Sequence, residues 1–162
     1  MAPSPRICCA IAYPAWRKTR APATLARTAA RVAASLARPE GLAGEISIVL
    51  SSNAEVQKLN AFWRGKDMPT NVLSFAAHDA PGQQNPSGAD ALGDIILAFE
   101  TCKSEAHAEG KSLENHMTHL VIHGVLHLLG YDHMRDADAK KMMALEIRAL
   151  KVLDIVNPYI IP

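Results

Sequence analysis

The chain has 162 residues, of which 49% are hydrophobic and 20% are charged, a composition typical of one globular domain with a real core. It has no apolar run approaching the roughly 20 residues that cross a bilayer, so we expect neither a membrane span nor a secretory signal. The three cysteines form no Cys-x-x-Cys pair. This pattern argues against a disulfide framework and predicts a reducing, cytoplasmic location.

The net charge of +1 hides an asymmetry along the chain. Residues 1–39 carry seven basic side chains and no acidic one, whereas the remainder carries 10 basic and 16 acidic side chains. A basic N-terminal face can meet phosphates, and an acid-poor, Arg- and Ala-rich start is also typical of an organelle transit peptide. We favour a solvated helix face, because this segment supplies predicted elements of the fold.

Hydrophobic periodicity predicts the first four elements in chain order. A strand over 7–12 is followed by a helix over 23–36, in which an apolar stripe recurs at helical spacing (Leu25, Ala29, Val32 and Leu36). A β-branched strand over 45–50 then leads into a helix that Ser52 or Asn53 caps and that runs to about residue 63.

The second part of the chain predicts two more strands, three more helices and one long polar loop. The strands span 72–75 and 93–99, the loop spans 79–91, and the helices span 100–109, 112–129 and 136–152. Strands in front and helices behind predict an α+β fold in which helices cover a sheet. We expect a single domain over residues 1–162, with its core at about 7–155.

Residues 123–133 read HGVLHLLGYDH and contain the most informative pattern in the chain. His123 and His127 are four residues apart, so they share one face of a helix. Gly130 suits the left-handed conformation that ends a helix, after which His133 can return as a third ligand. Three neutral imidazoles with a fourth position left open are the usual layout of a catalytic zinc site.

The spacing matches that of the long zinc-protease motif with one change. Those proteases place a glutamate after the first histidine as general base, and here that residue is Gly124. A mid-helix glycine costs about 1 kcal/mol relative to alanine, so we expect another element to approach the helix closely there. The pattern favours metal-assisted hydrolysis of something other than a peptide.

Further blocks carry a family resemblance: RGKDMPTNVLSF at 64–75, LGDI at 92–95 and NPY at 157–159. With HGVLHLLGYDH, their order and separation resemble the YbeY family of metal-dependent endoribonucleases. The resemblance implies a mixed sheet with packed helices and one Zn²⁺ per chain, bound by His123, His127 and His133. It also implies single-stranded ribosomal RNA as substrate, roles in 16S rRNA 3′-end maturation and ribosome quality control, and the ribosome or its small subunit as partner. Arg64 matches an arginine that the family needs for activity.

Arg64 and Asp132 are the candidate catalytic residues beside the metal ligands. The planar guanidinium of Arg64 can hold two phosphate oxygens, and Lys66 is a weaker phosphate contact. Asp132 either orients a histidine or a water, or caps the turn after Gly130. The nucleophile is left open between water and the RNA 2′-hydroxyl.

Several nearby side chains have two interpretations. Phe62 and Trp63 can stack on unpaired bases, but we expect them to be core anchors. His116 and His119 either hydrogen-bond around the site or are buried structural histidines, which we favour. Asn71 either shapes a turn or bonds near the site.

Two other functions compete with the nuclease. One is an RNA- or ribosome-binding factor whose metal is only structural, which the basic N-terminal stretch permits. The other is a metallopeptidase, which the missing glutamate at Gly124 disfavours. Three nitrogen ligands also accept nickel or copper in place of zinc, and the pattern does not predict an oligomeric state.

Overall fold

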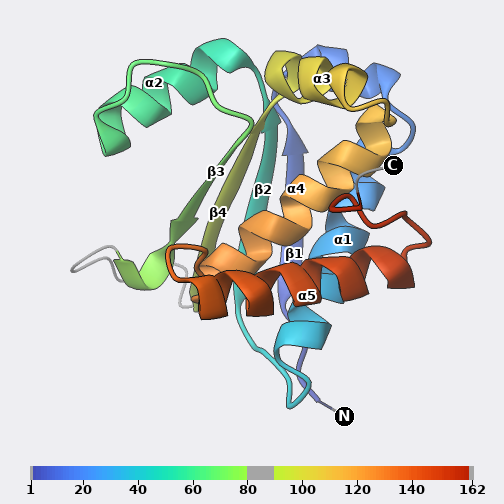
Figure 1. Cartoon of the computed structure of the whole chain (residues 1–162). Helices are drawn as coiled ribbons and strands as arrows, with labels where there is room; N and C mark the ends of the chain where they lie inside the picture. The colour runs from blue at the N-terminus through green and yellow to red at the C-terminus, as the bar shows by residue number, and fades with distance from the viewer. Residues whose placement is uncertain (1, 80–89, 161–162) are drawn as a thin grey trace.

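The computed structural model describes residues 2–79 and 90–160, and within them four strands form one sheet in the order β1-β2-β4-β3 (Figure 1). The strands are β1 (Arg6–Ile11), β2 (Glu45–Ser51), β3 (Val72–Ala76) and β4 (Ala91–Ala98). β1, β2 and β4 are parallel, whereas β3 pairs antiparallel with β4 at one edge. The predicted α+β fold with a mixed sheet is therefore confirmed.

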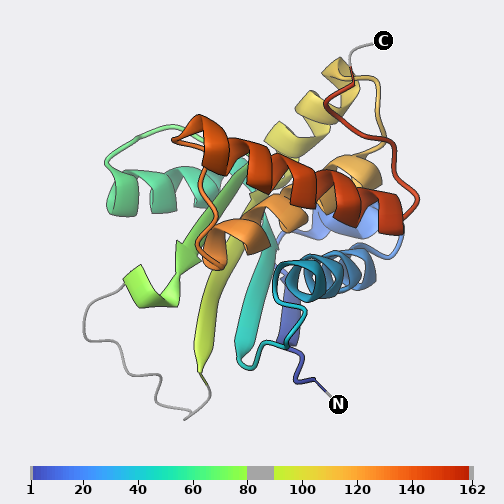
Figure 2. The same cartoon turned by 60° about the horizontal axis from the view of Figure 1, so that its bottom comes forward.

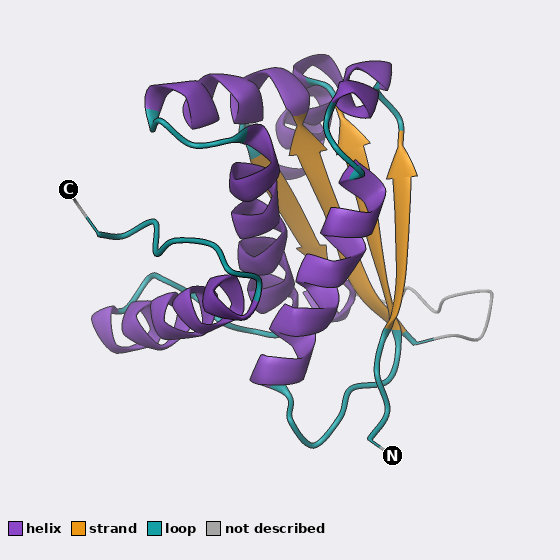
Figure 3. Cartoon of the chain, turned by 90° about the vertical axis from the view of Figure 1, so that its right-hand side faces the viewer, coloured by secondary structure: helices purple, strands orange, loops and turns teal. Residues whose placement is uncertain are grey.

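Helices cover both faces of this sheet. They are α1 (Pro22–Ala37), α2 (Asn53–Arg64), α3 (Phe99–Ala108), α4 (Leu113–Leu128) and α5 (Asp136–Val152). α1 and α4 pack on one face with the main core beneath them, and α5 lies across α4 (Figures 2 and 3). α2 covers the opposite face over a smaller apolar cluster of Val56, Leu73, Ile96 and Ala98. α4 therefore lies between the sheet and α5.

The predicted elements are confirmed, with ends that shift by a few residues. Ser52 caps α2 by accepting from the backbone N–H of Glu55 at 3.4 Å. β4 begins at Ala91 rather than at Gly93, and residues 80–89 of the predicted loop lie outside the described residues. Two short 3-10 turns, Pro14–Lys18 and Ala77–Asp79, were not predicted. Among the described helices, none combines the length and apolarity that crossing a membrane requires.

The buried face of α1 differs from the predicted stripe. Leu25, Val32 and Leu36 are half-buried at its edge. The centre of the face consists of alanines, namely Ala26, Ala29, Ala30, Ala33, Ala34 and Ala37. Small side chains let α1 and α4 approach closely, so the interface is centred on alanine although larger residues carry the periodic signal.

Gly124 lies where α4 crosses β3 and β4. A Cβ atom built on it would stand 3.0 Å from both Ile95 Cγ2 and Ser74 Oγ. This confirms the close approach that the mid-helix glycine predicts. It also fixes which face of α4 meets the sheet, and so where His123 and His127 are directed.

Candidate metal centre

The three histidines of the HGVLHLLGYDH run meet at one place, at the C-terminal end of α4. The Nε2 atoms of His123 and His127 are 3.0 Å apart. The chain turns at Gly130, whose φ of 94° is left-handed as expected, and brings back His133. One ligand atom from each of the three histidines lies within 4.8 Å of the others. This group could hold a metal ion.

The tautomers of two of these histidines can be inferred from their partners. His127 Nδ1 lies 3.0 Å from the carbonyl oxygen of Tyr131, which can only accept, so this nitrogen carries a proton. His123 Nδ1 lies 2.5 Å from Glu146 Oε1, which accepts in the same way. In the neutral rings the two Nε2 lone pairs then face each other. A shared cation satisfies both, so the residues fit a metal ion.

The surroundings of His127 also favour its neutral form. Burial lowers the pKa of His127, and the nearby His123 lowers it further, against the opposing effect of the Tyr131 carbonyl. Only neutral imidazole has the lone pair that binds a metal. The lowered pKa of His127 therefore favours the neutral ring that a metal ion requires.

Glu146 is a site residue that the sequence analysis missed. It is 2% exposed, on the buried face of α5, and it binds His123. Tyr159 donates its hydroxyl to the other carboxylate oxygen, and the ring of His119 lies beside both groups. Burial alone would raise the pKa of Glu146, but hydrogen bonds from His119, His123 and Tyr159 outweigh it and lower this pKa to about 2.

A signal for Glu146 exists in the sequence, although it is weak. Met142, Ala149 and Leu150 are buried on α5, and Glu146 is buried with them on the same helical face. A carboxylate on an apolar stripe requires a partner. The partners stand 23 and 13 residues away, at His123 and Tyr159. The spacing alone therefore did not identify them.

Replacing Glu146 with glutamine is expected to weaken metal binding about 10- to 100-fold, the usual effect of losing a carboxylate behind a metal-binding histidine. Zinc affinity, measured by competition with a chromogenic chelator, checks this. Glu55→Gln, on the exposed face of α2, is the matched control. Tyr159→Phe keeps the carboxylate and removes only its hydroxyl donor, and should give a smaller loss. Unchanged zinc affinity in a folded Glu146→Gln protein would contradict this role.

The turn that carries His133 is held from two sides. Arg38, at the end of α1, donates to the carbonyl of Leu129 at 2.7 Å and to the Tyr131 hydroxyl at 3.4 Å. Asp132 accepts from the backbone N–H of Met134 at 3.0 Å. This bond is the turn-capping contact foreseen as one alternative for Asp132. Arg38 shows that at least one basic residue of the N-terminal segment has a structural contact.

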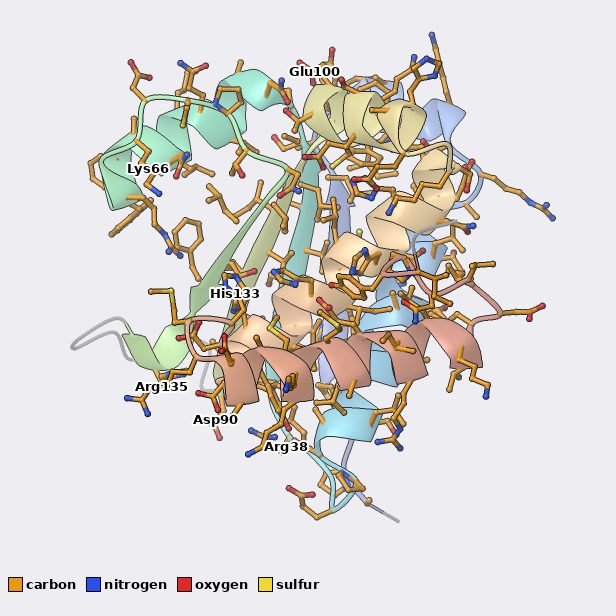
Figure 4. The ribbon with its side chains drawn as sticks, in the orientation of Figure 1. Arg38, Lys66, Asp90, Glu100, His133 and Arg135 are labelled. Carbon is orange, nitrogen blue, oxygen red and sulfur yellow. The ribbon has the colours of Figure 1, made fainter. Side chains whose placement is uncertain are left out.

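An open cleft of about 1710 Å³ joins the histidines to other predicted residues. Its lining includes Arg64, Lys66 and Asp132 together with the three histidines. Arg64 donates to the carbonyl of Ser74 at 2.8 Å, and its guanidinium lies 5.3 Å from the centre of the Phe75 ring. Figure 4 shows Lys66 near the end of α2 and His133 below it in the same view. The cleft thus brings together residues from separate parts of the chain.

His116 and His119 have different surroundings. His116 is buried and bonds through Nε2 to Glu105 at 2.8 Å, so it is a buried structural histidine, as we favoured. Asn71 donates to the same Glu105 at 3.0 Å and accepts from the backbone N–H of Val72, which shapes the start of β3. His119 instead reaches the Glu146 group behind the metal centre.

The expectation that Phe62 and Trp63 anchor the core is wrong. Phe62 is 77% exposed and Trp63 is 61% exposed. They occupy the last turn of α2, which ends where Gly65 takes a left-handed φ of 68°. Trp63 shares the helical face of Val56, through which α2 contacts the sheet, but the last turn lies at the margin of the apolar cluster, where Trp63 contacts Phe75.

The fold and the cluster define an α+β protein with a three-histidine site, able to hold a metal ion, in an open cleft. The family model described as Endoribonuclease YbeY matches residues 14–154. The chain belongs to this family. An Endoribonuclease YbeY of Paramagnetospirillum magneticum is 53% identical over 152 residues, covering 92% of each chain. Its counterpart in Zymomonas mobilis is 49% identical over 144 residues, covering 83% of this chain and 82% of the relative.

A solved structure supports the fold independently. A solution structure of a Thermotoga maritima protein matches with a TM-score of 0.53 and covers 93% of this chain and 91% of its own. The sequence identity is 22%, so this likeness bears on the architecture alone.

Proposed function

We propose that this chain is a metal-dependent endoribonuclease that cuts exposed, single-stranded ribosomal RNA. Membership of the family makes it an endoribonuclease and RNA its substrate. The observation that supports metal dependence is the pair of Nε2 atoms of His123 and His127, 3.0 Å apart, with no proton available to place between two neutral rings. They lie in a cleft that Arg64 also lines.

Zinc is the proposed ion, one per chain, held by His123, His127 and His133. Three neutral nitrogen ligands and an open fourth position suit catalytic zinc, although nickel and copper accept the same ligands. Such an ion supplies Lewis-acid polarisation of a phosphoryl oxygen. Glu146 and the Tyr131 carbonyl hold two of the rings in the tautomer that leaves Nε2 for the ion.

Arg64 is the proposed phosphate-binding group. Its planar fork can hold two phosphoryl oxygens, where negative charge accumulates whether water or the RNA 2′-hydroxyl attacks. Lys66 lines the same cleft and adds positive charge. Asp132 is a proposed positioning residue that shapes the turn before His133 and stands beside the cleft.

The cellular role is proposed from the family. It comprises 16S rRNA 3′-end maturation, wider rRNA processing and ribosome quality control in the cytoplasm, with the ribosome or its small subunit as partner. The open form of the cleft supports a macromolecular substrate, because an RNA strand needs access along its length.

The alternative metallopeptidase lacks a base at the required position. Gly124 faces β3 and β4, so a glutamate there would meet Ile95 and Ser74 rather than a substrate. The alternative of an RNA-binding factor with a structural metal is tested directly by turnover.

Removing the metal should abolish cleavage, and returning zinc should restore it. The assay follows an end-labelled single-stranded rRNA fragment on a gel, with metal per chain measured in the same preparation. Nickel and copper are added in parallel to compare ions. Undiminished cleavage by metal-free protein would contradict metal dependence. RNA bound without cleavage by the zinc-loaded protein would favour the binding factor.

A further inference from the structure

The last turn of α2 carries two large aromatic side chains on the protein surface, Phe62 and Trp63, which we call the aromatic pair. Their rings stand edge to face, with centroids 4.8 Å apart. Both are mostly exposed, at 77% and 61%. Moving apolar surface of this size out of water is favourable, so a partner that covers the two rings gains free energy.

The aromatic pair is connected to the cleft by direct contacts. The ring of Trp63 contacts the ring of Phe75 of β3, with ring centroids 6.3 Å apart. The guanidinium of Arg64 lies over the same Phe75 ring at 5.3 Å. One side chain, Phe75, therefore supports both Trp63 and the proposed phosphate-binding residue. A ligand held by Arg64 has an aromatic surface next to it.

The charge around the aromatic pair suits a polyanion. Arg64 follows it directly and Lys66 comes two residues later, and both line the cleft. The acid of this turn, Asp67, accepts from Gln57 at 3.0 Å. Aromatic rings beside basic side chains are the usual means of binding single-stranded nucleic acid, because every base has a π-face and every linkage has a phosphate.

We propose that Phe62 and Trp63 stack on unpaired bases of the RNA strand whose phosphate lies in the metal cleft. This inference rests on the proposed function and supplies a physical origin for single-strand preference. In a duplex the bases stack on each other and hide the faces that the aromatic pair needs. Arg64 and Lys66 hold the backbone, while the aromatic pair requires an unpaired base.

Intrinsic fluorescence can report this contact, because the two tryptophans differ in exposure. Trp16 is 0% exposed and donates its indole N–H to Ser51, whereas Trp63 faces solvent. The full chain with its metal would be titrated with unlabelled dodecamers of uridine or adenosine, and with a duplex of the same length. Fluorescence would be read immediately after mixing, and gels run on the same samples would measure how much RNA has been cut, so that binding is taken from readings made before cleavage is detectable.

We expect single-stranded RNA to quench the fluorescence and duplex RNA to quench it weakly. The affinity of each variant for a labelled single-stranded dodecamer would be measured by fluorescence anisotropy. Trp63→Phe should keep most of this affinity. Trp63→Leu should lose about 10-fold, and a Phe62→Leu, Trp63→Leu double variant should lose more. Val152→Ala, an exposed apolar residue at the end of α5, is the control. Duplex affinity should change little in all variants.

Equal single-strand affinity in the wild type and the leucine variants would overturn the proposal and leave the aromatic pair to a protein partner. Equal loss for single-stranded and duplex RNA would overturn it too, because stacking would not be the cause. Melting temperatures verify that each variant folds. Binding is read before cleavage is detectable, so a failure here is distinct from absent metal-dependent cleavage.

Discussion

His127→Ala should lose both bound zinc and RNA cleavage while the fold is kept. His127 supplies one of the two Nε2 atoms that face each other at 3.0 Å. Without it, a cation bound by His123 loses its second nitrogen ligand. The loss of metal affinity should exceed about 100-fold. That is the upper end of the loss seen when a carboxylate or carbonyl that hydrogen-bonds to a metal-binding histidine is removed. The side chain also donates to Tyr131, so stability should fall by about 1 kcal/mol.

The matched control for this variant is His107→Ala. His107 is exposed near the end of α3 and is absent from the cleft lining. Metal per chain, gel cleavage of single-stranded RNA and circular dichroism are compared across the three proteins. Equal cleavage by wild type and His127→Ala would reveal either a contaminating nuclease or a site elsewhere. It would contradict the assignment of His127 as a metal ligand that cleavage requires.

Arg64→Ala is expected to reduce cleavage about 100- to 1000-fold with zinc content unchanged. Removal of a single group that stabilises transition-state charge has an effect of this size. Within residues 2–79 and 90–160, the one hydrogen-bond partner of Arg64 is the Ser74 carbonyl, and Arg64 is exposed, so stability should change by no more than about 0.5 kcal/mol. Arg64→Lys should recover part of the rate, because ammonium keeps the charge and loses the two-pronged geometry.

Lys58→Ala separates this effect from a general loss of positive charge. Lys58 lies on the same helix, pairs with Glu55 on the exposed face and does not line the cleft. Cleavage rates at saturating and limiting RNA distinguish weaker binding from slower chemistry. Zinc lost together with activity in Arg64→Ala would place this arginine in the metal centre instead of beside the substrate.

Local signals made much of the fold predictable. Strand and helix periodicity, the Ser52 cap and Gly130 act within a few residues of one another, and each feature appears as expected. The face of α1 was less predictable. Its buried centre consists of alanines, whose small hydrophobicity hides them among larger neighbours in any periodic pattern. Close helix packing selects them, and only the partner helix reveals that.

The environment of the aromatic pair could not be derived from spacing. Phe62 and Trp63 follow a helical pattern that serves equally for a core anchor and for an exposed surface. Which applies depends on where α2 stops relative to the sheet beneath it. That relation involves β3 and β4, and it is decided when the helix docks.

The sequence by itself determined that three histidines cluster, because four-residue helical spacing and a left-handed glycine place His123, His127 and His133 by local geometry. Only the tertiary structure decided what surrounds them. Glu146 reaches His123 because α5 packs across α4. Arg64 lines the cleft that contains the histidines because β3, which Arg64 contacts, lies beside α4. Contacts between distant segments depend on packing of the whole core, which no short window of sequence contains.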